Sequence, residues 1–217
     1  MKKLLIFLFS TLISFNSYGL FEKTVCVEID AQNRGGIIYL PNKTKPFSGK
    51  NLCKYENGQN KTKGKVKDGK VDGKSITWYT NGQIMREGNY KDDKRDGKST
   101  KWYKNGQIER ESNYKNDKLD GKWTWWYEDG QIKRETNYKD DKNHGMSTYW
   151  RENGQKRVEG NYKNDKLDGK WTWWHENGQK WAEGNYKDDK YDGKWTNWYE
   201  NGQKRVKANY KNGIIVD

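Results

Sequence analysis

The chain has 217 residues and a formal net charge of +13 at pH 7, from 43 Lys and Arg against 30 Asp and Glu. Its mean hydropathy of −1.40 and its few aliphatic residues are typical of a disordered chain, which cannot bury enough apolar surface to fold. Twelve tryptophans and fifteen tyrosines, placed in register along the sequence, argue against disorder.

Residues 1–19 have the pattern of a secretory signal peptide. A basic start at Lys2 and Lys3 precedes an apolar run over residues 4–15, and residues 17–19 offer the small side chains that a signal peptidase reads. Cleavage after this stretch predicts an exported protein, in the periplasm, at the cell surface or in the medium. An uncleaved anchor is the alternative, although the apolar run is short for a helix that spans a bilayer.

Residues 20–48 form a lead-in segment ahead of the repeats. Alternating side chains over residues 24–29 and an apolar run over residues 35–40 predict two short strands. Pro41 and Pro46, the only prolines of the chain, bracket a turn that leads into the first repeat.

Cys26 and Cys53 are the only cysteines of the chain. In an exported protein an even pair predicts a disulfide, which here ties the lead-in segment to the first repeat. A pair of free thiols is the alternative, because the sequence cannot place the two Cα atoms. Two cysteines alone do not make a metal site.

A 24-residue unit recurs from residue 49 to residue 217, in seven copies that two glycines mark. A period of this size is typical of an array of supersecondary units. The first glycine falls at Gly49, Gly73, Gly97, Gly121, Gly145, Gly169 and Gly193. The second, which follows Asn or once Asp129, falls at Gly58, Gly82, Gly106, Gly130, Gly154, Gly178 and Gly202.

Each copy predicts one β-hairpin. Asn-Gly between two aromatic-rich runs is a strong signal for a two-residue type I′ turn, which needs positive φ at both positions. In the copy that begins at Asp168 we expect strands at residues 170–175 and 179–186, with residues 187–192 turning the chain into the next copy. The predicted fold class is all-β, with tandem antiparallel β-hairpins in one extended single-sheet meander that neighbouring copies stabilise.

A two-residue turn at Asn177-Gly178 also predicts which side chains face each other. It places Trp174 opposite Trp181, and it pairs large residues with small ones, which repairs the weakness that glycine brings to a strand. The large and small pairs are Trp173 with Ala182, Trp171 with Gly184 and Tyr186 with Gly169.

The other face carries one tryptophan per copy, at Trp78, Trp102, Trp126, Trp150, Trp174 and Trp198. The same turn gives them as cross-strand partners Met85, Glu109, Lys133, Arg157, Trp181 and Arg205. An Arg over an exposed indole contributes about 0.5–1 kcal/mol, so the tryptophan column with Arg157 and Arg205 is the candidate binding face. The alternative is that the tryptophans do no more than hold the sheet together.

The sequence shows no constellation of residues that predicts catalysis, and we expect a protein that is not an enzyme and has no cofactor. His144 and His175 are the only histidines, and neither recurs in the other copies. No Ser or Cys has the context of a nucleophile, and no His or Cys spacing predicts a metal. Asp-rich turns such as residues 188–192 resemble calcium loops only weakly, because lysines flank them and a bidentate Glu is missing.

A basic and aromatic surface is also typical of proteins that bind single-stranded nucleic acid. Predicted export and the alternation of lysines with acidic residues argue against that partner. Charged side chains along strands also keep sheets from aggregating, which is the plainer interpretation of this pattern. The partner that we expect is another protein, with an anionic envelope polymer or a lipid surface as alternatives.

The unit at residues 120–142, DGKWTWWYEDGQIKRETNYKDDK, and its siblings resemble the variant class of MORN repeat. Residues 40–50 are similar to the lead-in of that family's first copy, and the resemblance covers residues 39–210. It implies serial β-hairpins, a protein-binding or membrane-associated role and no catalysis. Bacterial members are commonly labelled YwqK-like antitoxins, which implies a toxin as partner. The predicted export fits that label poorly unless the toxin acts in the envelope.

Overall fold

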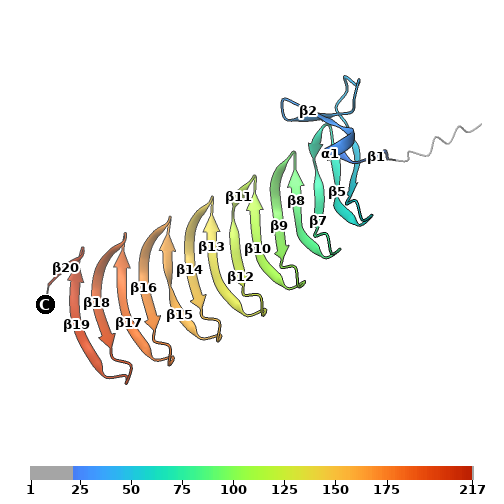
Figure 1. Cartoon of the computed structure of the whole chain (residues 1–217). Coiled ribbons are helices and arrows are strands. Elements are labelled where there is room, and N and C mark those ends of the chain that lie inside the picture. Colours follow the sequence, from blue (N-terminus) through green and yellow to red (C-terminus); the bar gives the residue numbers. More distant parts are fainter. Residues whose placement is uncertain (1–21, 217) are drawn as a thin grey trace, which may run out of the picture.

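The computed structural model describes residues 22–216, so the predicted signal peptide lies outside the described residues. The repeats form one antiparallel meander in which each long strand pairs with the next long strand along the chain (Figure 1). The predicted fold class of tandem antiparallel hairpins in an extended sheet is therefore confirmed. No helix within residues 22–216 is long and apolar enough to cross a membrane.

The large sheet has 18 strands. They are β1 (Thr24–Val25), β4 (Gly49–Lys54), β5 (Asn60–Lys67), β6 (Lys70–Val71), β7 (Gly73–Trp78), β8 (Ile84–Lys91), β9 (Lys94–Trp102), β10 (Ile108–Lys115), β11 (Lys118–Leu119), β12 (Gly121–Trp126), β13 (Ile132–Lys139), β14 (Lys142–Trp150), β15 (Lys156–Lys163), β16 (Lys166–Trp174), β17 (Lys180–Lys187), β18 (Lys190–Trp198), β19 (Lys204–Lys211) and β20 (Ile214–Ile215).

The lead-in segment covers the first hairpin of the array. Strand β1 pairs in parallel with β4, and a separate hairpin is formed by β2 (Gln32–Arg34) and β3 (Ile37–Tyr39). A small apolar core joins this segment to the sheet through Val25, Ile38, Phe47 and Val66. Cys26 and Cys53 form a disulfide, as the sequence predicts, so the lead-in segment is also joined covalently to the first hairpin. Because this segment covers the N-terminal end of the sheet, we call it the cap.

The strand predicted over residues 24–29 is wrong beyond Val25, because the chain turns into the short helix α1 (Val27–Asp30). The Asp30 carboxylate accepts a hydrogen bond from the Cys26 N–H (2.8 Å), and Asn51 Oδ1 accepts one from the Val27 N–H (2.9 Å). These two backbone donors therefore have side-chain acceptors, and the local turn replaces a sheet ladder.

The Asn-Gly loops do not form the predicted type I′ turn. At His175 to Gln179 the Gly178 N–H donates to the His175 carbonyl (3.1 Å), and positive φ falls on Gly178 (83°) but not on Asn177. This is a type I turn followed by a left-handed glycine, the usual three-residue hairpin loop with a bulge. Asn177 stabilises it by accepting a hydrogen bond from the Gln179 N–H (3.0 Å).

The type I′ turn lies at the opposite edge of the sheet, in the Lys-Asp-Asp-Lys segments. Asp188 and Asp189 both have positive φ, at 48° and 66°, and Lys187 pairs with Lys190 around them. Asp and Asn tolerate the left-handed region better than other residues with a side chain, which explains why they recur here in place of glycine. The two ends of each hairpin thus use different turns.

The longer Asn-Gly loop shifts the predicted pairing near the turn by one residue. Trp174 pairs with Lys180 and not with Trp181, which occupies the bulge. Farther from the loop the predicted pairs are confirmed: Trp173 with Ala182, Trp171 with Gly184 and Gly169 with Tyr186.

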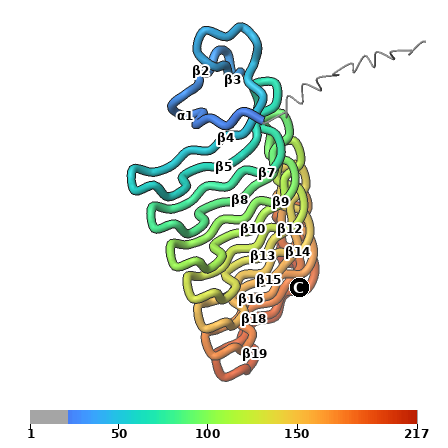
Figure 2. The backbone as a smooth tube through the Cα atoms, turned by 90° about the vertical axis from the view of Figure 1, so that its right-hand side faces the viewer, coloured from blue at the N-terminus to red at the C-terminus, as the bar shows by residue number. Residues whose placement is uncertain are grey.

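Side-chain hydrogen bonds connect neighbouring hairpins along both edges of the sheet, where Figure 2 shows the successive turns in rows. At the Asn-Gly edge the Tyr103 hydroxyl donates to the Trp126 carbonyl of the next copy (2.8 Å). At the other edge Asp189 Oδ1 accepts from the Leu167 N–H (2.7 Å). Equivalent bonds recur along the array, so each turn is held by its neighbour.

The sheet presents two different faces. One face, which we call the aromatic face, carries Trp171 and Trp173 of β16 with Ala182, Gly184 and Tyr186 of β17. The rings cover each other, with centroids 5.8 Å apart for Trp171 and Trp173, so that Trp171 is only 4 % exposed. The opposite face, which we call the threonine face, carries Lys170, Thr172 and Trp174 with Glu183 and Asn185, and it is the face of the predicted tryptophan column.

We expect Gly184→Ala to lower the free energy of unfolding by about 1–3 kcal/mol, because a Cβ there would overlap the Trp195 ring. Gly88→Ala is the matched control, since it has the same position in its own repeat and its Cβ would lie 3.4 Å from the Ser99 hydroxyl. That change should be neutral or slightly stabilising. Urea unfolding measures both, and an equal loss in the two variants would contradict this account.

Candidate binding face

A network of Lys, Glu and Thr lies along the middle of the threonine face. Glu183 Oε2 accepts from Lys170 (3.1 Å), from Lys180 (2.5 Å) and from the Thr172 hydroxyl (3.5 Å). Burial by itself raises the pKa of Glu183, but the hydrogen bonds from Lys180 and Lys170 outweigh it and hold this pKa below its ordinary value. The carboxylate therefore stays charged on this face.

The network recurs in the inner copies. Lys74 pairs with Glu87 (2.7 Å), Lys98 pairs with Glu111 (2.5 Å), and Lys122 pairs with Glu135. Where Met146 replaces the lysine, Lys156 pairs with Glu159 instead (2.5 Å). These pairs were not predicted from the sequence, although a lysine and a glutamate that keep the 24-residue step on facing strands are a readable signal for them.

The first and last copies break the pattern. Lys63 occupies the position that holds glutamate in the inner copies, and it pairs across strands with Leu52 and Ile76. Lys207 makes the same exchange in the last copy, opposite Thr196. The threonine face is thus charge-balanced in its middle and cationic at its two ends.

The six predicted tryptophans lie on this face, all half-buried, next to the Lys, Glu and Thr network. Their observed cross-strand partners, from Trp78 to Trp198 in order, are Ile84, Ile108, Ile132, Lys156, Lys180 and Lys204. Lysines of one copy reach the indole of the next: Lys156 Nζ lies 5.8 Å from the Trp174 ring centroid, and Lys180 Nζ lies 5.8 Å from that of Trp198. Cation–π contact along the column is therefore made by lysine.

The predicted roles of Arg157 and Arg205 as partners of the column are wrong. Both are exposed and stand at the bulge after the Asn-Gly loop, where the pairing skips one residue. The Arg205 guanidinium lies 5.7 Å from the Tyr199 ring centroid instead. Trp181, at the same position of its own copy, packs edge-on against Trp173 of the aromatic face (6.5 Å).

The two histidines have structural partners. His175 Nε2 lies 3.1 Å from the Trp198 carbonyl, at the position where four other copies use a tyrosine hydroxyl and one uses Arg151, and His144 Nδ1 lies 3.3 Å from Asn164 Oδ1. Within residues 22–216 no group of three or more His, Cys, Asp or Glu side chains is placed to hold a metal ion.

The geometry defines the class of protein as an antiparallel β-hairpin repeat array with one aromatic and one charged face. A family model described as MORN repeat variant matches six consecutive copies, at residues 71–92, 95–116, 119–140, 143–164, 167–188 and 191–212. These matches span more than half of the chain, and the protein belongs to the MORN repeat variant family. The hairpin of β4 and β5 lies outside the matched residues, although its strands pair in the same register. No curated protein matches the chain.

The aromatic face predicts a loss of stability at alkaline pH. Burial, followed by the neighbouring Tyr149, raises the pKa of Tyr162 to about 12 from an ordinary value of 10.0. A tyrosine whose pKa is higher in the folded state contributes stability that is complete below pH 10 and is lost as the pH rises toward 12. Burial and Tyr191 raise the pKa of Tyr186 in the same way.

We therefore expect the free energy of unfolding to fall between pH 10 and pH 12. In Tyr162→Phe this fall should be shallower, because the phenol that ionises has been removed while the ring remains. Lysines also lose their charge in this range, and comparing the two chains at each pH cancels their contribution. Denaturant titrations across the range would contradict the assignment if the two curves ran parallel.

Proposed function

We propose that the protein is an exported, non-catalytic binding module that holds another protein on the threonine face. The observation that carries the proposal is the row of six half-buried tryptophans beside a recurring network of Lys, Glu and Thr. Tryptophan is enriched where proteins bind each other, because it combines a large apolar area with a polar N–H group. Membership of a repeat family supports a role as a binding module.

The inner part of the face favours a protein over a polyanion. In four inner copies the lysine of the Asp-Gly-Lys motif is paired with a glutamate of the same chain; these lysines are Lys74, Lys98, Lys122 and Lys170. A polyanion would have to displace these carboxylates, whereas a protein surface with its own polar groups can contact them as they stand. Identical groups recur every two strands, about 10 Å apart, so a partner can engage several copies at once.

Export is supported by two observations. The sequence of residues 1–19 has the pattern of a signal peptide, and Cys26 and Cys53 are joined by a disulfide, which is typical of proteins in oxidising compartments. A partner in the periplasm, at the surface or in the medium follows from this proposal. The more specific role of a YwqK-like antitoxin would require a toxin in one of those places.

The binding proposal is tested with the purified mature chain as bait for cross-linking to envelope and secreted proteins of the host. Trp150→Ala combined with Trp174→Ala should lower the retained partner by about tenfold or more, because interface tryptophans are often worth 2 kcal/mol or more each. Arg157→Ala is the matched control, as Arg157 is exposed and off the column, and it should retain the partner. Melting temperatures separate lost binding from lost folding.

Two outcomes would reject this function. A partner retained equally by all three chains would assign the tryptophans to the sheet alone. Binding only to anionic vesicles or to envelope polymer, lost at about 1 M salt where charges are screened within about 3 Å, would favour the lipid or polymer alternative.

The export proposal is tested by tagging the C-terminus in the native host, fractionating the cells and determining the mature N-terminus by mass spectrometry. A chain that begins near Leu20 outside the cytoplasm is the expected result. A full-length chain in the cytoplasm would contradict export and make a cytoplasmic toxin the partner to search for among neighbouring genes.

A further inference from the structure

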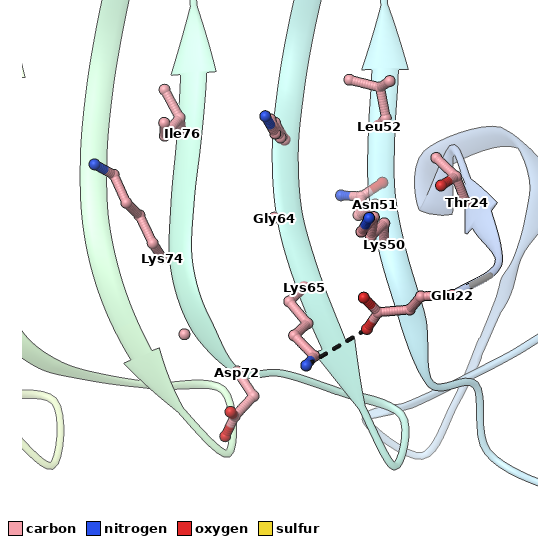
Figure 3. Close-up of a pocket in the computed structure, with 12 residues that line it drawn as sticks. Glu22, Thr24, Lys50, Asn51, Leu52, Gly64, Lys65, Asp72, Lys74 and Ile76 are labelled. Atoms are coloured by element: carbon pink, nitrogen blue, oxygen red, sulfur yellow. Dashed lines mark ion pairs between the residues drawn. The ribbon is translucent and has the colours of Figure 1, made fainter. Parts of the chain in front are cut away.

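A cavity of about 500 Å³ lies at the N-terminal end of the threonine face, where the lead-in segment meets the first copies. Figure 3 shows side chains from β1, β4, β5 and β7 around it. Four lysines line it, Lys50, Lys63, Lys65 and Lys74, and Leu52 and Ile76 supply apolar surface between them. The acidic side chains of the lining are Glu22 and Asp72.

Two of the four lysines have acidic partners within the chain. Lys65 pairs with Glu22 (3.5 Å), the contact drawn in Figure 3, and Lys74 pairs with Glu87 (2.7 Å). Lys50 and Lys63 form no salt bridge with any residue of the described part of the chain. Residues 1–21 contain no acidic side chain that could reach them.

The inner copies show what a lysine in the position of Lys50 binds. Its equivalents Lys98 and Lys170 each hold a carboxylate, that of Glu111 (2.5 Å) and that of Glu183 (3.1 Å). In the first copy Lys63 stands where those glutamates stand, on the strand that pairs with the strand of Lys50. The first copy therefore repeats the lysine half of a Lys–Glu pair, and it has a second lysine where the carboxylate would be.

We propose that this cavity binds an acidic segment of the protein partner, with a Glu or Asp carboxylate between the ammonium groups of Lys50 and Lys63. An apolar residue next to that carboxylate would pack on Leu52 and Ile76. This inference rests on the proposed function, because it names the chemistry by which the partner is recognised at one end of the face. Two ammonium groups without acidic partners favour a carboxylate that arrives from outside.

The last copy is the nearest comparison within the chain. Lys207 and Lys194 line a smaller cavity of about 260 Å³. Glu183 is part of that lining and already accepts from Lys170 and Lys180. The N-terminal cavity is larger, and Glu22 and Thr24 of the N-terminal segment line one side of it. We therefore assign the acidic segment to the N-terminal cavity.

The test measures binding of a fluorescent peptide of alternating Glu and Leu to the mature chain by anisotropy, with a Gln and Leu peptide for comparison. Lys63→Glu restores the residue of the inner copies and places a carboxylate beside Lys50, so it should weaken peptide binding by about tenfold or more. Lys50→Met, which copies Met146 at the equivalent position, should weaken binding without adding a negative charge. Both exchanges are ones that the chain already uses, which favours folded variants.

Lys104→Glu is the matched control for charge. It makes the same change in net charge as Lys63→Glu, and other copies have glutamate at that position, for example Glu128 and Glu152. Its affinity for the peptide should stay within about twofold of the parent chain. Equal weakening by Lys104→Glu and Lys63→Glu would reduce the effect to net charge and overturn the site.

Two further results would overturn the assignment. The first is that inorganic phosphate or phosphatidylglycerol vesicles, and not the Glu and Leu peptide, bind in a way that depends on Lys63. The second is equal binding of the Gln and Leu peptide. If the peptide fails to bind while a partner is still captured in a tryptophan-dependent manner, this inference fails and the proposed function stands.

Discussion

The structure depends on the pairing of each strand with its neighbours, because the repeat sheet is one layer thick. A ring on such a sheet can be buried only by other side chains of the same face. Trp171 is only 4 % exposed because the rings of Tyr162, Trp173 and Tyr186 surround it. Trp173 is on the same strand, β16, and the other two rings come from the neighbouring strands β15 and β17. A half-buried ring contributes about 2–3 kcal/mol, which is too little to order a hairpin alone. Folding therefore needs neighbouring copies.

The two kinds of turn determine how those copies are placed. Next to the type I′ turn at Asp188 and Asp189 the register shifts by two residues, between Gly184 and Tyr186, whereas the three-residue loop before Gln179 shifts it by one. The added residue, Trp181, leaves the register of the threonine face and packs against Trp173. The bulge is thus what brings lysine to the tryptophan column, as in the pairing of Trp174 with Lys180.

Much of this fold could be predicted from the sequence, because the period is long and the aromatic residues keep it. The hairpins and the two faces followed from the repeat, and the pairs of Trp173 with Ala182 and Trp171 with Gly184 followed from the position of the Asn-Gly turn. The turn type did not, since Asn-Gly suits both a type I′ turn and a type I turn with a bulge. In the structure the type I turn occurs together with a hydrogen bond from the Gln179 N–H to the Asn177 side chain and with a contact from His175 to the Trp198 carbonyl of the next copy, and spacing reveals neither.

The candidate face was predicted in part for the same reason. Its tryptophans were found because one residue type recurs at one position, but their cationic partners were displaced by one residue because the bulge was not foreseen. Lys63 stands where the inner copies have glutamate, and the importance of this change is seen only when those glutamates are known to pair with lysines. The pairs of Lys98 with Glu111 and of Lys170 with Glu183 form because facing strands bring them together. The sequence alone does not show which of these side chains are paired across strands.

The bonds along the two edges have a consequence for how such a protein can change its length. The Tyr103 hydroxyl reaches only the next copy, and the Asp189 carboxylate reaches only the preceding one. A copy inserted in or deleted from the middle of the array would find the same neighbours on both sides, and the cap and the final strands would keep their own contacts. The array is in this sense a molecular ruler, whose reach changes in steps of about 10 Å while its two ends stay as they are.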